Sequence, residues 1–419
     1  MINNFITQSI IRGFNAINGG NLFRFVEEMK VINQPTRNNN DTKLTKYLNS
    51  WGCSGSISQM PLMTKKDIKR KISSLKLKNA YKKFYTGGST GEPLMIVYSK
   101  NRSIIRAASA LYYNGLAGYK LGDSFLIVRS RNRNRLVKYL KNETLFIPEN
   151  LSEESIDGLW EKIVRDRIRF LVGYPSVFSE ICSFLNKKKK KKKRHHSIKA
   201  IISTAEPLVS DEAKMLADTF NCIVLNRYAN EENGIIAQQH TFGGELFVER
   251  YGLYVEVVDS NTLLPVKKGE SGKVVVTDYY SDLFPVIRYD TGDYAVAGRY
   301  DNNGHLLTLY EINGRIVDQF RKTNGEVFSP LTLGPYIRRP LTNLGLYAQF
   351  QFAQLSKYSF ELRIKTDMPD IPEQTKTEIS LGLKKVLGKE AEVSIVIKDE
   401  IKRFNSGKRP LYVYEAPKH

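Results

Sequence analysis

The chain has 419 residues, of which 41% are hydrophobic and 11% aromatic, enough to fill a sizeable core; this composition excludes a disordered chain. Lys and Arg outnumber Asp and Glu by 64 to 43, for a formal net charge of +21. No stretch approaches the roughly 18 consecutive apolar residues of a membrane-spanning helix, so we expect a protein without a membrane span.

The N-terminal segment has apolar residues at helical spacing over residues 2–10. Because asparagines and Arg12 interrupt the pattern and no small-residue cleavage site follows, we expect a surface-packed amphipathic helix rather than a secretory signal. The three cysteines, Cys53, Cys182 and Cys222, are isolated and odd in number. They favour a cytoplasmic location, where thiols stay reduced, and argue against structural zinc.

Residues 1–80 are predicted to be mainly helical, with Thr64 as the N-cap of a helix that starts at Lys65. Short apolar runs typical of buried strands then alternate with helical patterns. The predicted strands span 125–129, 170–173, 200–203 and 222–225, and the predicted helices span 154–165, 177–185 and 210–220. This alternation indicates a mostly parallel sheet covered by helices.

From about Tyr251 the pattern changes to short antiparallel strands with turn residues between them. The predicted strands of the remaining chain span 254–258, 272–277, 293–296, 347–352, 359–364 and 392–397. The single predicted helix spans 373–387. We therefore predict an α/β protein with two domains. The large N-terminal domain (1–314) has helix-covered, mostly parallel sheets and a small antiparallel β subdomain, and the small, mobile C-terminal domain (315–419) is α+β.

An unbroken run of lysines, Lys187–Lys193, precedes Arg194 and two histidines. Such a run can form an electrostatic patch for nucleic acid or anionic lipid. Alternatively, it is a solvated loop that repulsion among like charges keeps extended. We favour the loop and expect no nucleic-acid partner, because no aromatic residues interleave with the lysines to stack on bases.

A glycine-rich segment, Tyr85–Pro93 (YTGGSTGEP), is a candidate for binding phosphates. Its glycines permit positive φ angles, so backbone N–H groups can point into one concavity, and its hydroxyls add donors. The residues that could contact phosphates are Thr86, Gly87, Gly88, Ser89, Thr90 and Gly91. The segment lacks the lysine of the GxxxxGK[ST] phosphate loop, and many glycine–serine segments are plain connectors.

This segment resembles the phosphate loop of the AMP-forming adenylating superfamily, which includes acyl-CoA synthetases, luciferases and the adenylation domains of peptide synthetases. Five further segments resemble other elements of that superfamily, in the same order, and the set spans nearly the whole chain. They are STAEPL (203–208), NRYANEENG (226–234), FPVIRYDTGD (284–293), NGRIVDQFRKTNGEVFSP (313–330) and IKRFNSGKRP (401–410). The short length, MPLMTKKDI and LVGYPSVF look most like the phenylacetate–coenzyme A ligase branch, and within it relatives from capsular polysaccharide gene clusters.

The resemblance implies a nucleotide site. Asp293, expected at the end of a turn that begins at Arg288, would accept hydrogen bonds from the ribose hydroxyls; an Asp after Gly is also common as an Asx-turn residue. Tyr228 would offer its ring to adenine, and Asn226 would offer the donor and acceptor that suit the edge of the base. The backbone residues that would close the other side of the base are Ala205, Glu206 and Pro207.

The same resemblance implies the catalytic and metal-binding groups. Glu232, with Thr90, would hold Mg²⁺ near the phosphates, and the adjacent Glu231 could compete for this role. Arg315 would present its planar guanidinium to ribose or phosphate oxygens. Lys408 would reach the α-phosphate and the carboxylate together during adenylation.

The resemblance further implies an acyl pocket and a hinge. The acyl-binding residues would be Tyr174, Pro175, Ser203 and Ala229. The C-terminal domain would rotate about residues 315–320 between two half-reactions. The superfamily often carries an acidic residue or lysine as the pivot, whereas this chain has Val317 there and Asp318 next, so the pivot residue stays open.

We therefore expect an ATP-dependent ligase that activates a carboxylic acid as an acyl-adenylate, releases pyrophosphate and then forms a thioester with coenzyme A. Its ligands would be a small carboxylic acid, ATP, Mg²⁺ and coenzyme A. Two alternatives stay open. The adenylate could pass to an amine or hydroxyl of a sugar or carrier in polysaccharide biosynthesis, or the chain could be a basic nucleic-acid-binding protein with a vestigial adenylate fold.

Overall fold

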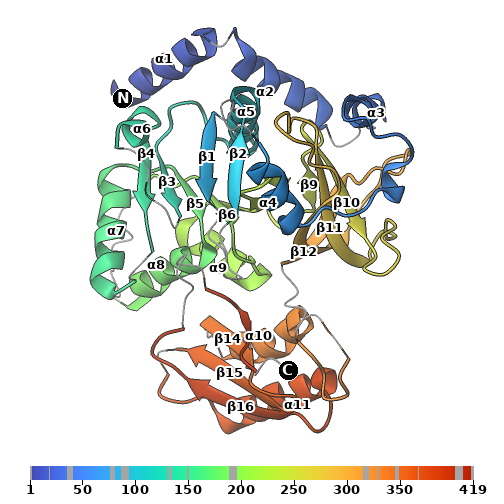
Figure 1. Ribbon diagram of the computed structural model, residues 1–419. Helices are drawn as coiled ribbons and strands as arrows, with labels where there is room; N and C mark the ends of the chain where they lie inside the picture. The colour runs from blue at the N-terminus through green and yellow to red at the C-terminus, as the bar shows by residue number, and fades with distance from the viewer. Residues whose placement is uncertain are drawn as a thin grey trace. The chain divides into compact units, whose positions relative to one another are not determined.

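The structure is a computed structural model, and the parts of the chain that it describes form two compact units, Met1–Ile312 and Asn313–His419 (Figure 1). The described residues are 2–17, 19–34, 41–75, 81–85, 94–129, 132, 135–148, 151–187, 196–314, 320–326, 328, 330–344, 349–366, 368–401 and 409–416. Among them, no helix is both long enough and apolar enough to cross a membrane. The functions predicted for the two domains, and the mobility of the second, stay predictions.

The N-terminal part of the first unit is helical, as expected. Its elements are α1 (Ile2–Ile17), α2 (Asn21–Ile32), α3 (Asp41–Ser50), the 3₁₀ helix η1 (Ile57–Gln59) and α4 (Lys65–Ser73). Thr64 caps α4 as predicted, because its hydroxyl accepts from Asp67 N (3.4 Å) while its own N–H donates to Asp67 Oδ2 (2.9 Å). In α1 the expected surface-packed helix is present: Ile11 packs against the cluster formed by α2 and the helix that begins at Lys100, whereas Phe5 is 73% exposed.

After α4 the chain forms an antiparallel strand pair and then strictly alternates strands with helices. The pair is β1 (Lys82–Tyr85) and β2 (Met95–Tyr98), followed by α5 (Lys100–Leu116). The alternating elements are β3 (Phe125–Val128), α6 (Arg135–Leu140), β4 (Glu143–Phe146), α7 (Glu153–Arg165), β5 (Phe170–Gly173), α8 (Pro175–Lys187), β6 (Ala200–Thr204), α9 (Ser210–Phe220) and β7 (Ile223–Asn230). Their five strands lie parallel in the order β4-β3-β5-β6-β7, as the helix–strand alternation predicted.

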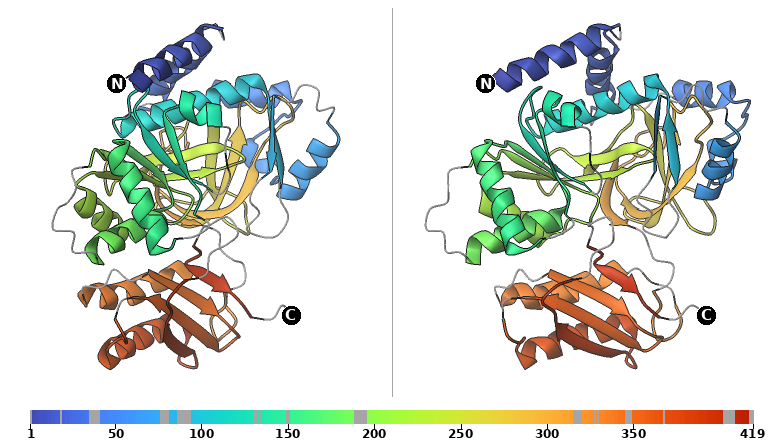
Figure 2. Two further views of the ribbon diagram at one scale, coloured as in Figure 1. Left: turned by 90° about the vertical axis from the view of Figure 1, so that its left-hand side faces the viewer. Right: turned by 60° about the vertical axis from the view of Figure 1, so that its left-hand side comes forward.

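The remaining strands of this unit are antiparallel and continue the same sheet. They are β8 (Gly234–Gln239), β9 (Leu246–Val248), β10 (Leu253–Val258), β11 (Ser271–Asp278), β12 (Tyr289–Ala297) and β13 (Thr308–Gly314). The full order of the 11 strands is β10-β11-β12-β13-β9-β8-β7-β6-β5-β3-β4. Figure 2 shows the antiparallel strands curving away from the parallel ones. The predicted fold class is confirmed, with the antiparallel strands joined edge to edge to the parallel ones.

The two faces of the parallel strands belong to different buried clusters. Leu171, Ile201 and Val224 lie in a buried cluster with side chains of α7, α8 and α9. The alternate residues Val172 and Ile202 lie in a separate cluster that includes residues just after α5. Since successive side chains of a strand point to opposite faces, this division fixes the faces on which Ser203 of β6 and Asn226 of β7 project.

Arg288 is a fully buried arginine that ties the N-terminal region to the antiparallel strands. Its Nε lies 3.2 Å from Glu256 Oε2, and its remaining N–H groups donate to the carbonyl oxygens of Ser58 (2.9 Å), Met60 (2.8 Å) and Leu263 (2.7 Å). Burial raises the pKa of Glu256, and the Arg288 guanidinium opposes that rise. The arginine of the RYDTGD segment is thus structural, since its bonds go to Glu256 and to backbone carbonyl oxygens.

We expect Arg288→Met to lower the free energy of unfolding by about 3–5 kcal/mol, because it leaves the Glu256 carboxylate buried without its partner. Urea unfolding followed by circular dichroism measures this loss. The matched control is Arg299→Met, which removes a half-exposed ion pair with Glu245 (2.8 Å) and should cost less than about 1 kcal/mol. Equal losses in the two variants would contradict the structural role of the buried pair.

The second unit is α+β, as predicted. Its sheet has the order β16-β15-β14-β17, with β14 (Gln349–Gln354), β15 (Ser359–Lys365), β16 (Glu392–Ile397) and β17 (Tyr412–Tyr414). The helices are η3 (Pro330–Leu333), α10 (Gly334–Asn343) and α11 (Glu373–Leu387). Apolar residues of α10 and α11, such as Ile337 and Leu383, form one core with Phe352, Phe360 and Leu362 of the sheet.

Candidate functional site

The carboxyl ends of β5, β6 and β7 bring several of the predicted site residues side by side. Gly173 of β5 pairs with Ser203 of β6, and Ser203 pairs with Asn226 of β7. The predicted acyl-binding residues 174–175 directly follow β5, and the predicted adenine-binding residues 205–207 directly follow β6. Ligands of open α/β sheets bind beyond the carboxyl ends of the strands, so these residues occupy the expected place for a site.

Ser203 and Asn226 project on the same face as α7, α8 and α9, since each lies two residues after a strand residue, Ile201 or Val224, of that core cluster. The Ser203 hydroxyl is fully buried and has no hydrogen-bond partner among the described residues. A buried hydroxyl without a partner is unfavourable by about 1–3 kcal/mol. It is therefore a polar group that a bound ligand can satisfy.

The segment after β6 has a strained backbone, and one of its side chains accepts a hydrogen bond from the first turn of α8. Ala205 has φ +71°, a left-handed conformation that is uncommon for a residue other than glycine. The Glu206 carboxylate accepts a hydrogen bond from Ser176 N (3.2 Å) in the first turn of α8. Pro175 opens α8, where a missing N–H and a fixed φ are tolerated. The predicted acyl-binding and adenine-binding segments are therefore linked through the start of α8.

The strongest link among the predicted nucleotide-binding residues joins Tyr228 and Asp293. The Tyr228 hydroxyl donates to Asp293 Oδ2 at 2.8 Å and lies 3.3 Å from Thr291 Oγ1. Tyr228 is buried on β7, whereas Asp293 is half-buried on β12. Two residues that the resemblance assigned to adenine and ribose thus lie in direct contact, although they are far apart in the chain.

Asp293 does not end a turn, which corrects the expectation from the sequence. It lies inside β12, and the Asx-type role belongs instead to Asp290, whose Oδ1 accepts from Gly292 N (2.8 Å). Gly292 has φ +75°, and the register between β11 and β12 shifts at this point. The bulge re-aims the strand, and the Asp293 carboxylate accepts from the Tyr228 hydroxyl.

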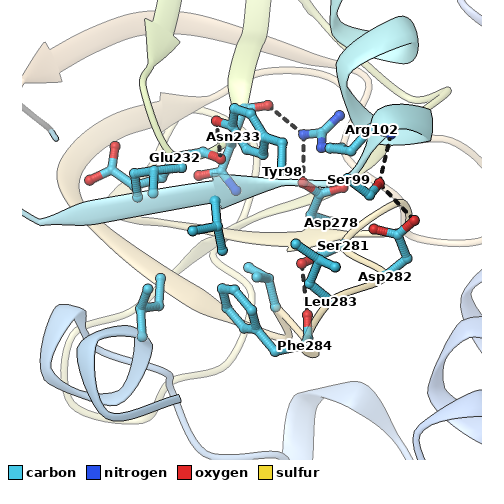
Figure 3. Close-up of a pocket in the computed structure, with 14 residues that line it drawn as sticks. Tyr98, Ser99, Arg102, Glu232, Asn233, Asp278, Ser281, Asp282, Leu283 and Phe284 are labelled. Atoms are coloured by element: carbon cyan, nitrogen blue, oxygen red, sulfur yellow. Dashed lines mark hydrogen bonds and ion pairs between the residues drawn. The ribbon is translucent and has the colours of Figure 1, made fainter. Parts of the chain in front are cut away.

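Glu232 lies in the connection between β7 and β8, and its carboxylate is held by the same strand that carries Asp293. Its Oε1 accepts from the hydroxyl of Tyr289, the first residue of β12, at 3.2 Å. Glu232 also lines a pocket with Tyr98, Arg102 and Asp278 (Figure 3). Of the two carboxylates that the resemblance assigned to ribose and to Mg²⁺, one therefore lies on β12 and the other is hydrogen-bonded to it.

The pocket beside Glu232 contains buried polar groups that the sequence did not single out. Arg102 and Asp278 form a buried ion pair of 2.5 Å, and Arg102 Nη2 also donates to Asn233 O (2.7 Å) (Figure 3). The side-chain amide of Asn233 and Arg102 Nε lack partners among the described residues. The pocket holds about 20 Å³, roughly the room of one ordered water, which would satisfy these groups.

The remaining predicted residues are Ala229, which the structure describes, and the glycine-rich loop, Arg315 and Lys408, which it does not. Ala229 lies on β7 directly after the register shift between β7 and β8. The glycine-rich loop Thr86–Gly91, Arg315 and Lys408 lie outside the described residues, although the strands β1 and β2 that flank the loop are paired with each other. Their predicted roles stay predictions.

The residues present fit a nucleotide better than a resident metal. Within the described part of the chain, no group of three or more His, Cys, Asp or Glu side chains is placed to hold a metal ion. A single carboxylate such as Glu232 is instead suited to Mg²⁺ that is held mainly by phosphate oxygens. The half-buried Asp293 carboxylate, oriented by Tyr228, is suited to accept hydrogen bonds from a diol.

The fold is shared with solved structures of two CoA ligases and of an ATP-bound protein. A 2-hydroxyisobutyryl-CoA ligase, in the postadenylation state with R3-HIB-AMP, is 15% identical with a TM-score of 0.66, over 92% of this chain and 86% of that chain. ATP-bound MatB from Rhodopseudomonas palustris is 17% identical with a TM-score of 0.54, over 78% of this chain and 66% of that chain. The anthranilate CoA ligase AuaEII, with anthranoyl-AMP, is 15% identical with a TM-score of 0.56, over 78% and 65%.

Comparison with curated protein sequences gave no match, and these structural likenesses do not distinguish one branch of the superfamily from another. The resemblance to the phenylacetate–coenzyme A ligase branch therefore stays a prediction. The sequence profile of the AMP-binding enzymes matches residues 34–280, which is more than half of the chain and includes Tyr228 and Glu232. The chain therefore belongs to the family of AMP-binding enzymes, as its resemblance to the AMP-forming adenylating superfamily predicted.

Proposed function

We propose that this enzyme activates a small carboxylic acid as an acyl-adenylate, releases pyrophosphate and transfers the acyl group to coenzyme A. The observation that carries the proposal is the contact between Tyr228 and Asp293. Tyr228, whose ring packs in the apolar cluster that contains Leu246 and Val274, holds with its hydroxyl a carboxylate suited to a ribose diol, in a chain that belongs to the AMP-binding enzymes.

The chemistry explains why such a site is needed. A carboxylate resists attack because its own oxygen is a poor leaving group. When its oxygen attacks the α-phosphorus of ATP, the bond between that phosphorus and the bridging oxygen breaks, pyrophosphate leaves, and the product is a mixed anhydride of the acid and AMP. Both reactants are anions, so the enzyme must align them and neutralise charge.

The described residues supply the alignment. Asp293, held by Tyr228, would fix the ribose and so set the position of the α-phosphorus. The unpartnered hydroxyl of Ser203 would bind a polar group of the acid or of the adenylate. Mg²⁺, when bound near Glu232, would neutralise charge on the phosphates. The high net charge of +21 would draw anionic substrates toward the protein.

Coenzyme A is the proposed acceptor because the solved structures that share the fold include ligases named for coenzyme A thioesters. In that step the thiol sulfur attacks the acyl carbon, the thiol proton is lost, and AMP leaves with the anhydride oxygen. An amine or hydroxyl acceptor would use the same adenylate, so the two outcomes share the first half-reaction.

The decisive experiment measures pyrophosphate and AMP release with ATP, Mg²⁺ and a panel of aromatic, aliphatic and hydroxylated carboxylic acids, with and without coenzyme A. We expect one class of acid to stimulate pyrophosphate release, and AMP turnover to require coenzyme A. Acid-dependent pyrophosphate release without any effect of coenzyme A would point to an amine or hydroxyl acceptor. If no acid stimulates pyrophosphate release although the protein binds ATP, the proposed function is wrong.

A further inference from the structure

The connection that carries Glu232 is held by residues from outside its own strands. The Tyr98 hydroxyl donates to the carbonyl oxygens of Glu231 and Glu232, the latter at 3.1 Å. The Arg102 guanidinium donates to Asn233 O at 2.7 Å, in a buried position. Three successive carbonyl groups of this turn are thus bonded to side chains of β2 and the first turn of α5.

Arg102 is itself fixed on the opposite side. It forms an ion pair of 2.5 Å with Asp278, and both side chains are almost fully buried, with exposed fractions of 5% and 3%. The backbone N–H of Arg102 donates to Ser99 Oγ (3.1 Å), and the Ser99 hydroxyl donates to Asp282 Oδ2 (2.8 Å). Figure 3 shows Arg102 between Asn233 and Asp278 on one side of the pocket. The guanidinium therefore cannot move without breaking a buried ion pair.

Tyr98 belongs to the strand pair that flanks the glycine-rich segment. It pairs with Lys82 of β1, its carbonyl oxygen accepts from Tyr81 N (2.9 Å), and at the other end of the pair Tyr85 lies opposite Met95. The Arg106 guanidinium lies 4.5 Å from the Tyr98 ring and adds a cation–π contact. The Tyr98 hydroxyl therefore connects this strand pair directly to the turn that carries Glu232.

We propose that Tyr98 and Arg102 are positioning residues, which hold the Glu232 turn against β2 so that the Glu232 carboxylate meets the Mg²⁺ of bound Mg-ATP. This inference rests on the proposed function. Both residues act through the backbone of residues 231–233. The Tyr289 hydroxyl, 3.2 Å from Glu232 Oε1, then orients the carboxylate itself.

The test is Tyr98→Phe in the full-length protein, which removes the donor but keeps the ring beside Arg106. Calorimetry measures the affinity for AMP without Mg²⁺ and for ATP over a range of Mg²⁺ concentrations. We expect the AMP affinity to be unchanged and the melting temperature to stay within a few degrees of wild type. The Mg²⁺ concentration for half-maximal ATP binding should rise about tenfold, because the turn that carries Glu232 loses its two hydrogen bonds to Tyr98. Arg102→Lys, which keeps a cation beside Asp278 but lacks the guanidinium fork, should shift the Mg²⁺ dependence in the same direction.

The matched control is Tyr300→Phe. Its hydroxyl also donates to a backbone carbonyl, that of Val266 (2.7 Å), in the same unit, but it does not contact the Glu232 turn. An unchanged Mg²⁺ dependence in Tyr98→Phe, an equal shift in the control, or a parallel loss of AMP affinity would each overturn the positioning role. Failure of the wild-type protein to bind ATP at any Mg²⁺ concentration would instead overturn the proposed function, and with it this inference.

Discussion

Lys408→Ala is expected to slow acyl-adenylate formation by at least ~10²-fold, as the loss of a key charge-stabilising group does. The expectation follows from the resemblance of residues 401–410 to the superfamily's terminal loop. During adenylation, negative charge lies on the α-phosphate, the leaving pyrophosphate and the attacking carboxylate. A compact ammonium on a flexible stem can contact two of these groups together. Acid-dependent pyrophosphate release under saturating ATP measures the effect.

Lys402→Ala is the matched control, because it removes the same charge from the same segment without the preceding glycine. Thioester formation from a pre-made acyl-adenylate and coenzyme A gives a second control. Lys408→Ala should carry out that step at a nearly unchanged rate, because the adenylate is already formed. Near-wild-type pyrophosphate release by Lys408→Ala would reject this lysine as the adenylation residue.

Asp293→Ala is expected to raise the KM for ATP by about 10²-fold. Removing the carboxylate would abolish two charge-assisted hydrogen bonds to the ribose, at about 1.5 kcal/mol each, and each 1.4 kcal/mol is a factor of ten in affinity. The variant should still fold, because the side chain is only half-buried and its partner, the Tyr228 hydroxyl, lies 3.3 Å from Thr291 Oγ1 as well. Steady-state kinetics and calorimetry with AMP measure the loss.

Asp290→Asn tests whether this effect is specific. Asp290 lies on the same strand, but its Oδ1 accepts from Gly292 N, a bond that an asparagine oxygen can also accept. We therefore expect a KM for ATP within about twofold of wild type. If Asp293→Ala binds AMP as tightly as wild type, the ribose assignment is wrong, whatever the effect of Asp290→Asn.

Most of the fold could be predicted because it depends on short-range patterns. The predicted helices 210–220 and 373–387 coincide with α9 and α11, and the predicted strands 170–173 and 392–397 coincide with β5 and β16. Helical and strand periodicities are local properties that each segment shows by itself. Alternation of the two patterns then indicated a parallel sheet, since successive strands separated by helices return in the same direction.

The exceptions arose where packing overrides local preference. No pattern in the sequence predicts α10, which contains Pro340, a residue that normally disrupts a helix interior. Burial of Ile337 and Leu341 in the core of the second unit favours the helix despite the proline. Likewise β7 extends beyond the predicted 222–225 to Asn230, because polar residues such as Arg227, which is paired with Thr204 of β6 and Gln238 of β8, take part in the ladders on both sides.

The order of the motifs in the sequence by itself determined the family and the residues to consider, because a nucleotide site uses chemically distinctive residues in a set order along the chain. Only the tertiary structure decided which of them meet. Tyr228 and Asp293 are 65 positions apart, and Tyr98 and Glu232 are 134 apart. Contacts over such separations depend on strand register and on the β12 bulge, and one residue of slip would turn each side chain to the opposite face of the sheet. That dependence is a property of the whole folded sheet, which no single segment encodes.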